Sequence, residues 1–270
     1  MTHTSVDEGA VAQAAARLAA AQDEGRPVAP VRDLLGEHDL AAAYAVQQEL
    51  TRRRRDAGAV VVGRKIGLTS PAVQRQLGVD QPDFGVLFAD MDVSGLPEVP
   101  SGRLLQPKAE AEIAFVLGAD LADGDLDPER IRAAVDYAVA ALEIVDSRVA
   151  DWDISLVDTV ADNASSGLFV LADTRLTLDA FEPRETTMRL YADDVLVSEG
   201  SGAACLGDPL NALAWLARTA REFGEPLRAG QVVLSGALGP MVPAPPGTRI
   251  RAEISSLGEV TAAFSEKRDA

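Results

Sequence analysis

The sequence is short of the residues on which several common chemistries depend. Its 270 residues include one cysteine, Cys205, and two histidines, His3 and His38. One cysteine cannot form a disulfide within the chain, which fits a reducing compartment. A histidine-rich zinc site is excluded, and a Ser-His-Asp or Cys-His nucleophile would have to use His38. We therefore expect any metal to be held mainly by carboxylates, which favours Mg²⁺ or Mn²⁺ over zinc.

Basic residues and long apolar runs are also scarce. Lysine and arginine number 25 against 42 acidic residues, a formal net charge of −17. This charge argues against a nucleic-acid or anionic-membrane partner, although a metal ion inside a site can still capture a small anionic substrate. No apolar run reaches the roughly 20 residues that cross a bilayer, and residues 1–8 lack the features of a secretory signal. We expect a cytoplasmic protein.

Helical patterns fill the first 57 residues. Val6, Ala10, Ala14 and Leu18 recur at four-residue spacing, which predicts a helix that ends near Gly25. A second helix is predicted over residues 39–55. Its four closing arginines are best interpreted as a solvated last turn, where cations complement the helix dipole.

Beyond residue 57 the pattern changes to short strands with two helices among them. One helix is predicted to begin after Asp127 and to carry Val135 and Val139 on its apolar face, and the other runs from Asp208 to Gly224. Strands are expected at residues 60–62, 110–117, 141–145, 188–192, 195–197, 231–235, 248–254 and 259–264. This order predicts an α+β fold, with a helical region at 1–57 packed on a single catalytic unit at 58–270.

Three glutamates are candidates for a metal site. Glu110 and Glu112 stand two apart on a predicted strand and therefore share a face. A divalent cation would relieve their repulsion, although an exposed edge strand with two solvated glutamates shows the same pattern. Glu143 lies in an apolar stretch where burial would be costly without a partner. It is either a third ligand or a polar residue on a half-exposed strand.

Other polar residues are candidates for proton transfer and anion binding. Lys65 lies in an apolar, glycine-flanked stretch, where a lysine can bind a carboxylate, act as a base or simply belong to a strand. Asp83 lies in segment 80–85, which is predicted to be a loop. It is either a general acid/base or a turn residue. Residues 162–167 could aim hydroxyls and N–H groups at an anion, or form Asx and Ser turns. Residues 235–239 are glycine-rich but lack the spacing of a phosphate loop.

Taken together, these segments resemble the 2-keto-4-pentenoate hydratases of the fumarylacetoacetate hydrolase superfamily. The resemblance covers roughly residues 38–264, and its motifs occur in the family's order. It is carried by residues 63–70, 73–85, 87–91, 105–114, 141–148, 158–167, 209–212 and 234–242.

The resemblance implies a mixed β-roll and a role for each candidate. Glu110, Glu112 and Glu143 would hold Mg²⁺ or Mn²⁺, and Lys65 and Asp83 would occupy the acid/base positions. Two serines would lie near the substrate: Ser165 and Ser235. The resemblance also implies a homo-oligomer, and neighbouring enzymes of its pathway are candidate partners.

The implied reaction is the hydration of 2-hydroxypenta-2,4-dienoate or a close homologue in the meta-cleavage degradation of aromatic compounds. Three alternatives stay open at this point. The same scaffold could decarboxylate 4-oxalocrotonate, or hydrolyse an acylpyruvate, although no histidine is placed to activate water for the hydrolysis. The third alternative is a non-catalytic partner of a downstream aldolase or dehydrogenase.

Overall fold

Two sheets form the centre of the chain, which a computed structural model describes over residues 6–70, 74, 79 and 81–266. In the larger sheet the strand order is β2-β1-β8-β3-β4-β5, and β9 also pairs with β3. Its strands are β1 (Val61–Gly67), β2 (Asp83–Phe88), β3 (Lys108–Leu117), β4 (Val135–Val145), β5 (Ser166–Leu171), β8 (Val232–Leu234) and β9 (Val242–Pro243). The order of the smaller sheet is β11-β10-β6-β7. Its strands are β6 (Thr187–Ala192), β7 (Val195–Ser201), β10 (Arg249–Ile254) and β11 (Gly258–Ala263).

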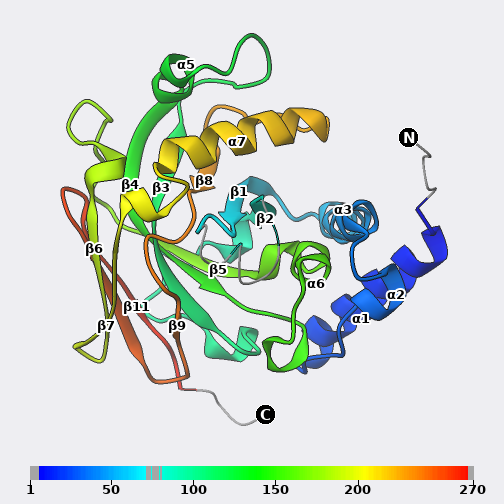
Figure 1. Cartoon of the computed structure of the whole chain (residues 1–270). Coiled ribbons are helices and arrows are strands. Elements are labelled where there is room, and N and C mark those ends of the chain that lie inside the picture. The colour runs from blue at the N-terminus through cyan, green and yellow to red at the C-terminus, as the bar shows by residue number, and fades with distance from the viewer. Residues whose placement is uncertain (1–5, 71–73, 75–78, 80, 267–270) are drawn as a thin grey trace.

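The helices surround these sheets unevenly. Figure 1 shows the N-terminal helices on the side of the molecule away from the smaller sheet, while α7 packs beside α5. The helices are α1 (Glu8–Glu24), α2 (Arg32–Leu35), α3 (Leu40–Asp56), α5 (Pro128–Ala133), α6 (Leu156–Ala161) and α7 (Pro209–Glu222). The larger sheet pairs β1 with β8 in parallel and its other strands antiparallel. This mixed, curled sheet with few helices between its strands confirms the predicted α+β class.

The long β3–β4 pair is the backbone of the core. Its register runs from Lys108 opposite Val145 to Leu117 opposite Val135. Both strands are buried over most of their length, which explains why they appear in the sequence as nearly continuous apolar runs. These strands therefore place Glu112 and Glu143 in the interior and leave Glu110 partly buried.

Two local predictions were wrong. The helix after Asp127 ends at Ala133, and Val135 and Val139 lie on β4. A four-residue spacing also fits one face of a strand, and the alternation of valine and tyrosine there favours a strand. The segment predicted as a loop at 80–85 enters strand β2 at Asp83, whereas Asp80 lies outside the described residues. Pairing with β1 overrides the turn preference of the proline and glycine around it.

The N-terminal helices attach to the sheet through a second apolar cluster and through buried polar groups. This cluster joins α1 and α3 to α6. The Gln47 side chain on α3 donates to the carbonyl oxygens of Phe84 on β2 and Val160 on α6, at 2.9 and 3.0 Å. Tyr44 on the same helix stacks on Phe84, with ring centroids 5.0 Å apart. The helical region therefore supports the start of β2.

None of the helices over the described ranges is long and apolar enough to cross a membrane.

Asp158 anchors the N-terminal region most strongly. Its fully buried carboxylate accepts from the backbone N–H groups of Val31, Arg32 and Ser155 and from the Arg32 guanidinium, at 2.6–2.9 Å. Asp158→Asn should lower the free energy of unfolding by about 2–4 kcal/mol, because the variant keeps the burial but loses the charge-assisted bonds. Chemical denaturation at neutral pH measures the loss.

Asp153→Asn is the matched control, because Asp153 pairs with the same Arg32 but has a 67% exposed side chain. It should change stability by less than about 1 kcal/mol. Burial alone would raise the pKa of Asp158, but hydrogen bonds from Ser155 and Arg32 outweigh burial and lower it. The gap between wild type and Asp158→Asn should therefore be full above about pH 5 and shrink as the pH falls further. Equal losses in the two variants would contradict this account.

Candidate active site

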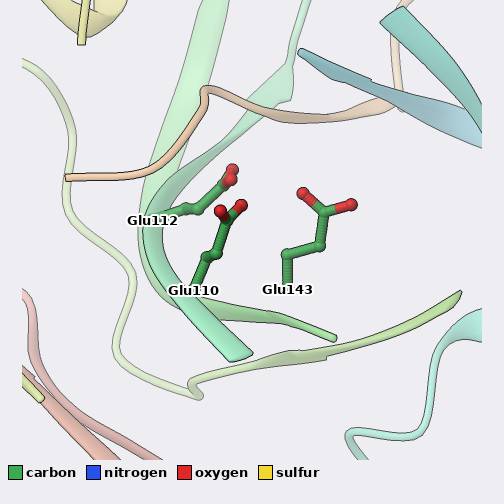
Figure 2. Close-up of side chains that lie close together, drawn as sticks. All are labelled: Glu110, Glu112 and Glu143. Atoms are coloured by element: carbon green, nitrogen blue, oxygen red, sulfur yellow. The ribbon is translucent and has the colours of Figure 1, made fainter. Parts of the chain in front are cut away.

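Three glutamates meet on the β3–β4 pair. Glu110 and Glu112 share a face of β3, and the antiparallel register places Glu143 of β4 directly opposite Glu110. One carboxylate oxygen from each residue lies within 4.8 Å of the others. Figure 2 shows the three side chains pointing toward a common space. The sequence-predicted ligand set is therefore brought together, in a geometry that could hold a metal ion.

Lys65 and Asp83 reach the same space from the neighbouring strands. Lys65 Nζ lies 3.0 Å from Glu143 Oε1, with both side chains almost fully buried. Asp83 is the first residue of β2 and pairs with Gly67. A Cβ atom on Gly67 would lie only 2.2 Å from Asp83 Oδ1, so this position needs glycine to leave room for the carboxylate.

Burial and mutual repulsion shift the ionisation of this cluster. Burial, followed by the charge of Glu143, raises the pKa of Glu110 to about 7 and that of Glu112 well above its usual value. Burial also raises the pKa of Asp83, although Lys65 opposes this. For Lys65, burial alone would lower the pKa, but the surrounding carboxylates outweigh it and raise it. Four carboxyl groups thus face one ammonium group in a buried space.

The donor set fits a hard divalent cation. Four buried carboxylate oxygens lack a hydrogen-bond donor among the described residues: Asp83 Oδ1, Glu112 Oε1 and both oxygens of Glu143, of which Oε1 forms the ion pair with Lys65. Buried oxygens of this kind are costly unless they are protonated or bind a cation. Carboxylate oxygens in a set of three suit Mg²⁺ or Mn²⁺ and leave positions open for a small ligand.

Glu112 is oriented by the backbone rather than by a side chain. Gly236 N–H donates to Glu112 Oε2 at 2.9 Å. Sequence reasoning selected the neighbouring Ser235 as a substrate residue, but its hydroxyl lies 3.5 Å from the Gly236 carbonyl oxygen. The contribution of Gly236 was missed, although the residue lies in the glycine-rich stretch 235–239 and in segment 234–242, which carries part of the resemblance.

Thr159, a residue that sequence reasoning missed, links Ser165 to Asp83. Thr159 Oγ1 on α6 is 3.2 Å from Ser165 Oγ and 3.5 Å from Asp83 Oδ2. Ser165 ends a turn in which Asn163, Ala164 and Ser165 all have φ between 52° and 54°. Each non-glycine residue in this left-handed region costs about 1–2 kcal/mol. The threonine lies within segment 158–167, but no local pattern marks its side chain, since only the fold brings α6 to β2.

The chain matches the family model described as fumarylacetoacetate (FAA) hydrolase C-terminal over residues 67–265. It is 54% identical to the TodF product hydratase of Pseudomonas putida F1, over 96% of each chain. It is 52% identical to a 2-keto-4-pentenoate hydratase of Burkholderia vietnamiensis, over 96% of this chain and 99% of the relative. Among solved structures, the 4-oxalocrotonate decarboxylase of Pseudomonas putida G7, complexed with magnesium and adipate, is similar. The TM-score is 0.89 at 33% identity, and the match covers 97% of this chain and 100% of that one.

Gly236→Ala should weaken metal binding. The residue has φ +107°, and an added Cβ would lie 2.4 Å from Thr69 Oγ1, so the loop must shift and its N–H must leave Glu112. We expect the Mn²⁺ affinity, measured by calorimetric titration, to fall about 10- to 100-fold, as for other residues that orient a metal ligand.

Gly230→Ala is the control for backbone strain alone. Gly230 also has a positive φ, +82°, but an added Cβ would meet nothing within 4 Å. Its Mn²⁺ affinity should stay at the wild-type value. Wild-type affinity in Gly236→Ala would show that the backbone contact does not orient Glu112.

Proposed function

The chain belongs to the fumarylacetoacetate hydrolase family, and we propose that it hydrates 2-hydroxypenta-2,4-dienoate, or a close homologue, to 4-hydroxy-2-oxopentanoate. The observation that carries the proposal is the group of three glutamates, of which Glu112 and Glu143 are buried, with Lys65 against Glu143. It occurs in a chain that is more than half identical to curated hydratases over nearly its whole length. The reaction would belong to the meta-cleavage degradation of aromatic compounds.

Glu110, Glu112 and Glu143 would hold the metal. When bound, Mg²⁺ or Mn²⁺ supplies a Lewis acid that polarises the substrate's C1 carboxylate and C2 oxygen and stabilises negative charge developing on that oxygen. The glutamates supply the charge and the open geometry for the ion. Gly236 keeps the Glu112 carboxylate in place.

The reaction needs the protonation of two carbon atoms and the addition of one water molecule. First the C2 hydroxyl loses its proton and C5 gains one, which converts the dienol into a 2-oxo-3-enoate. C4 is now electrophilic through conjugation with the C2 carbonyl. Water then adds its oxygen at C4, the proton released from this water is taken up by a base, and C3 gains a proton. The product differs from the substrate by one molecule of water.

Lys65 and Asp83 are proposed to handle these protons. The carboxylates around Lys65 favour its ammonium form, which can pair with the C2 oxygen and carries the proton that would be passed to carbon. The raised pKa of Asp83 suits a base that accepts a proton from the hydroxyl group or from water and passes it on. Ser165 and Ser235 are proposed to lie against the substrate.

The remaining proposals concern the whole protein. Residues 1–57 would act as a helical region that supports the catalytic unit at 58–270. We propose that the protein works in the cytoplasm as a homo-oligomer, with neighbouring pathway enzymes as candidate partners.

A spectrophotometric assay tests the function. Freshly generated 2-hydroxypenta-2,4-dienoate is supplied to protein treated with chelator, before and after Mg²⁺ or Mn²⁺ is restored. We expect the dienol absorbance to fall only when the metal is present, with 4-hydroxy-2-oxopentanoate identified as the product. The metal dependence follows because the glutamates alone offer no Lewis acid.

Two other outcomes would replace the proposal. The likeness to a 4-oxalocrotonate decarboxylase makes carbon dioxide release from 4-oxalocrotonate the appropriate second assay. Release with the dienoate left intact would assign a decarboxylase. Turnover of neither compound by metal-loaded protein would support a non-catalytic partner role.

Lys65→Met and Asp83→Asn should separate proton transfer from metal binding. Each should lower kcat by about 10²- to 10⁴-fold, the range for losing a general acid or base. Lys65→Met should bind Mn²⁺ at least as tightly as wild type, because it removes a positive charge 3.0 Å from Glu143. Steady-state kinetics and Mn²⁺ calorimetry make the two measurements.

Asp120→Asn is the matched control for Asp83→Asn. Asp120 is a half-exposed carboxylate paired with Arg228 on the surface. Its kcat and Mn²⁺ affinity should equal those of the wild type. Near-normal turnover in Lys65→Met or in Asp83→Asn would remove that residue from its proposed role.

A further inference from the structure

The turn at Asn163–Ser165 joins α6 to β5 and carries Ser165 into the site. Its three residues share the left-handed conformation, with φ values of 54°, 53° and 52°. A strained turn of this kind persists only where the surrounding contacts determine it. The contacts that hold it should therefore show what the turn is positioned for.

The side chain of Asn163 ties the turn to β2. Its Oδ1 accepts from Val86 N–H at 2.7 Å, and its Nδ2 donates to the Val86 carbonyl oxygen at 2.9 Å. β2 is the edge strand of the larger sheet, so the amide supplies to Val86 the two bonds that a further strand would supply. The approach is close, because a Cβ on Gly85 would lie 2.4 Å from the Asn163 carbonyl oxygen.

A buried arginine holds the base of the same turn. Arg148 donates through Nε to Asp162 Oδ1 at 2.5 Å and through Nη2 to the Asp162 carbonyl oxygen at 2.7 Å. Its Nη1 donates to the Ser166 carbonyl oxygen at 2.7 Å. Arg148 thus contacts the residue before the turn and the residue after it, whereas the Asn163 side chain contacts β2.

We propose that Asn163 is a positioning residue that fixes Ser165 against Asp83. Val86, to which it is bonded, lies three residues along β2 from Asp83. Ser165 reaches Asp83 through Thr159, at 3.2 and 3.5 Å. Asn163 therefore fixes the turn that carries Ser165 relative to β2, the strand that carries Asp83. This role rests on the proposed function, in which Ser165 and Asp83 act on the same substrate.

A double-mutant cycle tests the proposal. Asn163→Gly removes the amide and keeps a residue that accepts positive φ. It should lower kcat by about 10- to 100-fold, the scale of a misplaced catalytic group, with Mn²⁺ affinity within about twofold of wild type. In a Ser165→Ala background the same change should cost less than about threefold, because the group being positioned is already absent.

Asn163→Asp keeps the acceptor for Val86 N–H and loses the Nδ2 donor, so its kcat should fall between wild type and Asn163→Gly. The matched control is Asp193→Gly. Asp193 also has a positive φ, and its side chain likewise accepts from a backbone N–H, that of Arg249, but in the β6–β7 hairpin. Its kcat should equal that of wild type.

Equal losses of kcat from Asn163→Gly with and without Ser165 would overturn the proposal and assign a general structural role. If Asn163 had a general structural role, part of the Asn163→Gly protein would be misfolded and would bind no metal. The number of Mn²⁺ ions bound per chain would then fall, and this measurement needs no turnover. If metal-loaded wild type does not hydrate the dienoate, the proposed function has failed. The cycle is then measured on binding of 2-oxopentanoate to the Mn²⁺ form, where additivity would again overturn the positioning role.

Discussion

Four acidic side chains and one lysine share a buried space between β1, β2, β3 and β4, and this electrostatic constraint organises the site. Burial and repulsion push the pKa values of Glu110, Glu112 and Asp83 upward, so the fully ionised cluster is unstable without a cation. Lys65 neutralises part of this negative charge through its ion pair with Glu143. A divalent ion would neutralise the rest, and the proposed hydration needs the same ion. The repulsion within the cluster and the chemistry proposed for it thus follow from one arrangement.

Elements outside the β3–β4 pair hold the side chains of the site in place. The N-terminal helices touch the start of β2 through Gln47 and Tyr44, and α6 brings Thr159 to Asp83. Gly67 and Gly236 leave necessary space because they have no side chain. A Cβ on Gly67 would collide with Asp83, and a Cβ on Gly236 would collide with Thr69. The same need for precise placement explains why the strained left-handed turn before β5 is kept. A site built from several separate elements needs each element held in a fixed position.

Prediction from the sequence succeeded where one pattern had one structural meaning. Glu110 and Glu112 share a face because strand periodicity is two, and Asp208 begins α7 because its side chain caps the helix N-terminus. It failed where one pattern fits two structures. The spacing of Val135 and Val139 suits a helix face and a strand face equally, and Asp83 follows a proline yet begins a strand. Pairing with β3 and β1 decided these cases, and such pairing is not local.

By itself the sequence determined the kind of chemistry this protein can perform. Too few histidines and cysteines leave carboxylates as the available metal ligands, and the motifs around them identify the family. Only the tertiary structure decided the register of Glu143 against Glu110, the ion pair with Lys65 and the contacts of Thr159, Asn163 and Gly236. The physical reason is that hydrogen bonds and Coulomb interactions act over a few ångströms of space. Residues that are distant along the chain therefore acquire their roles only after folding brings them within that range.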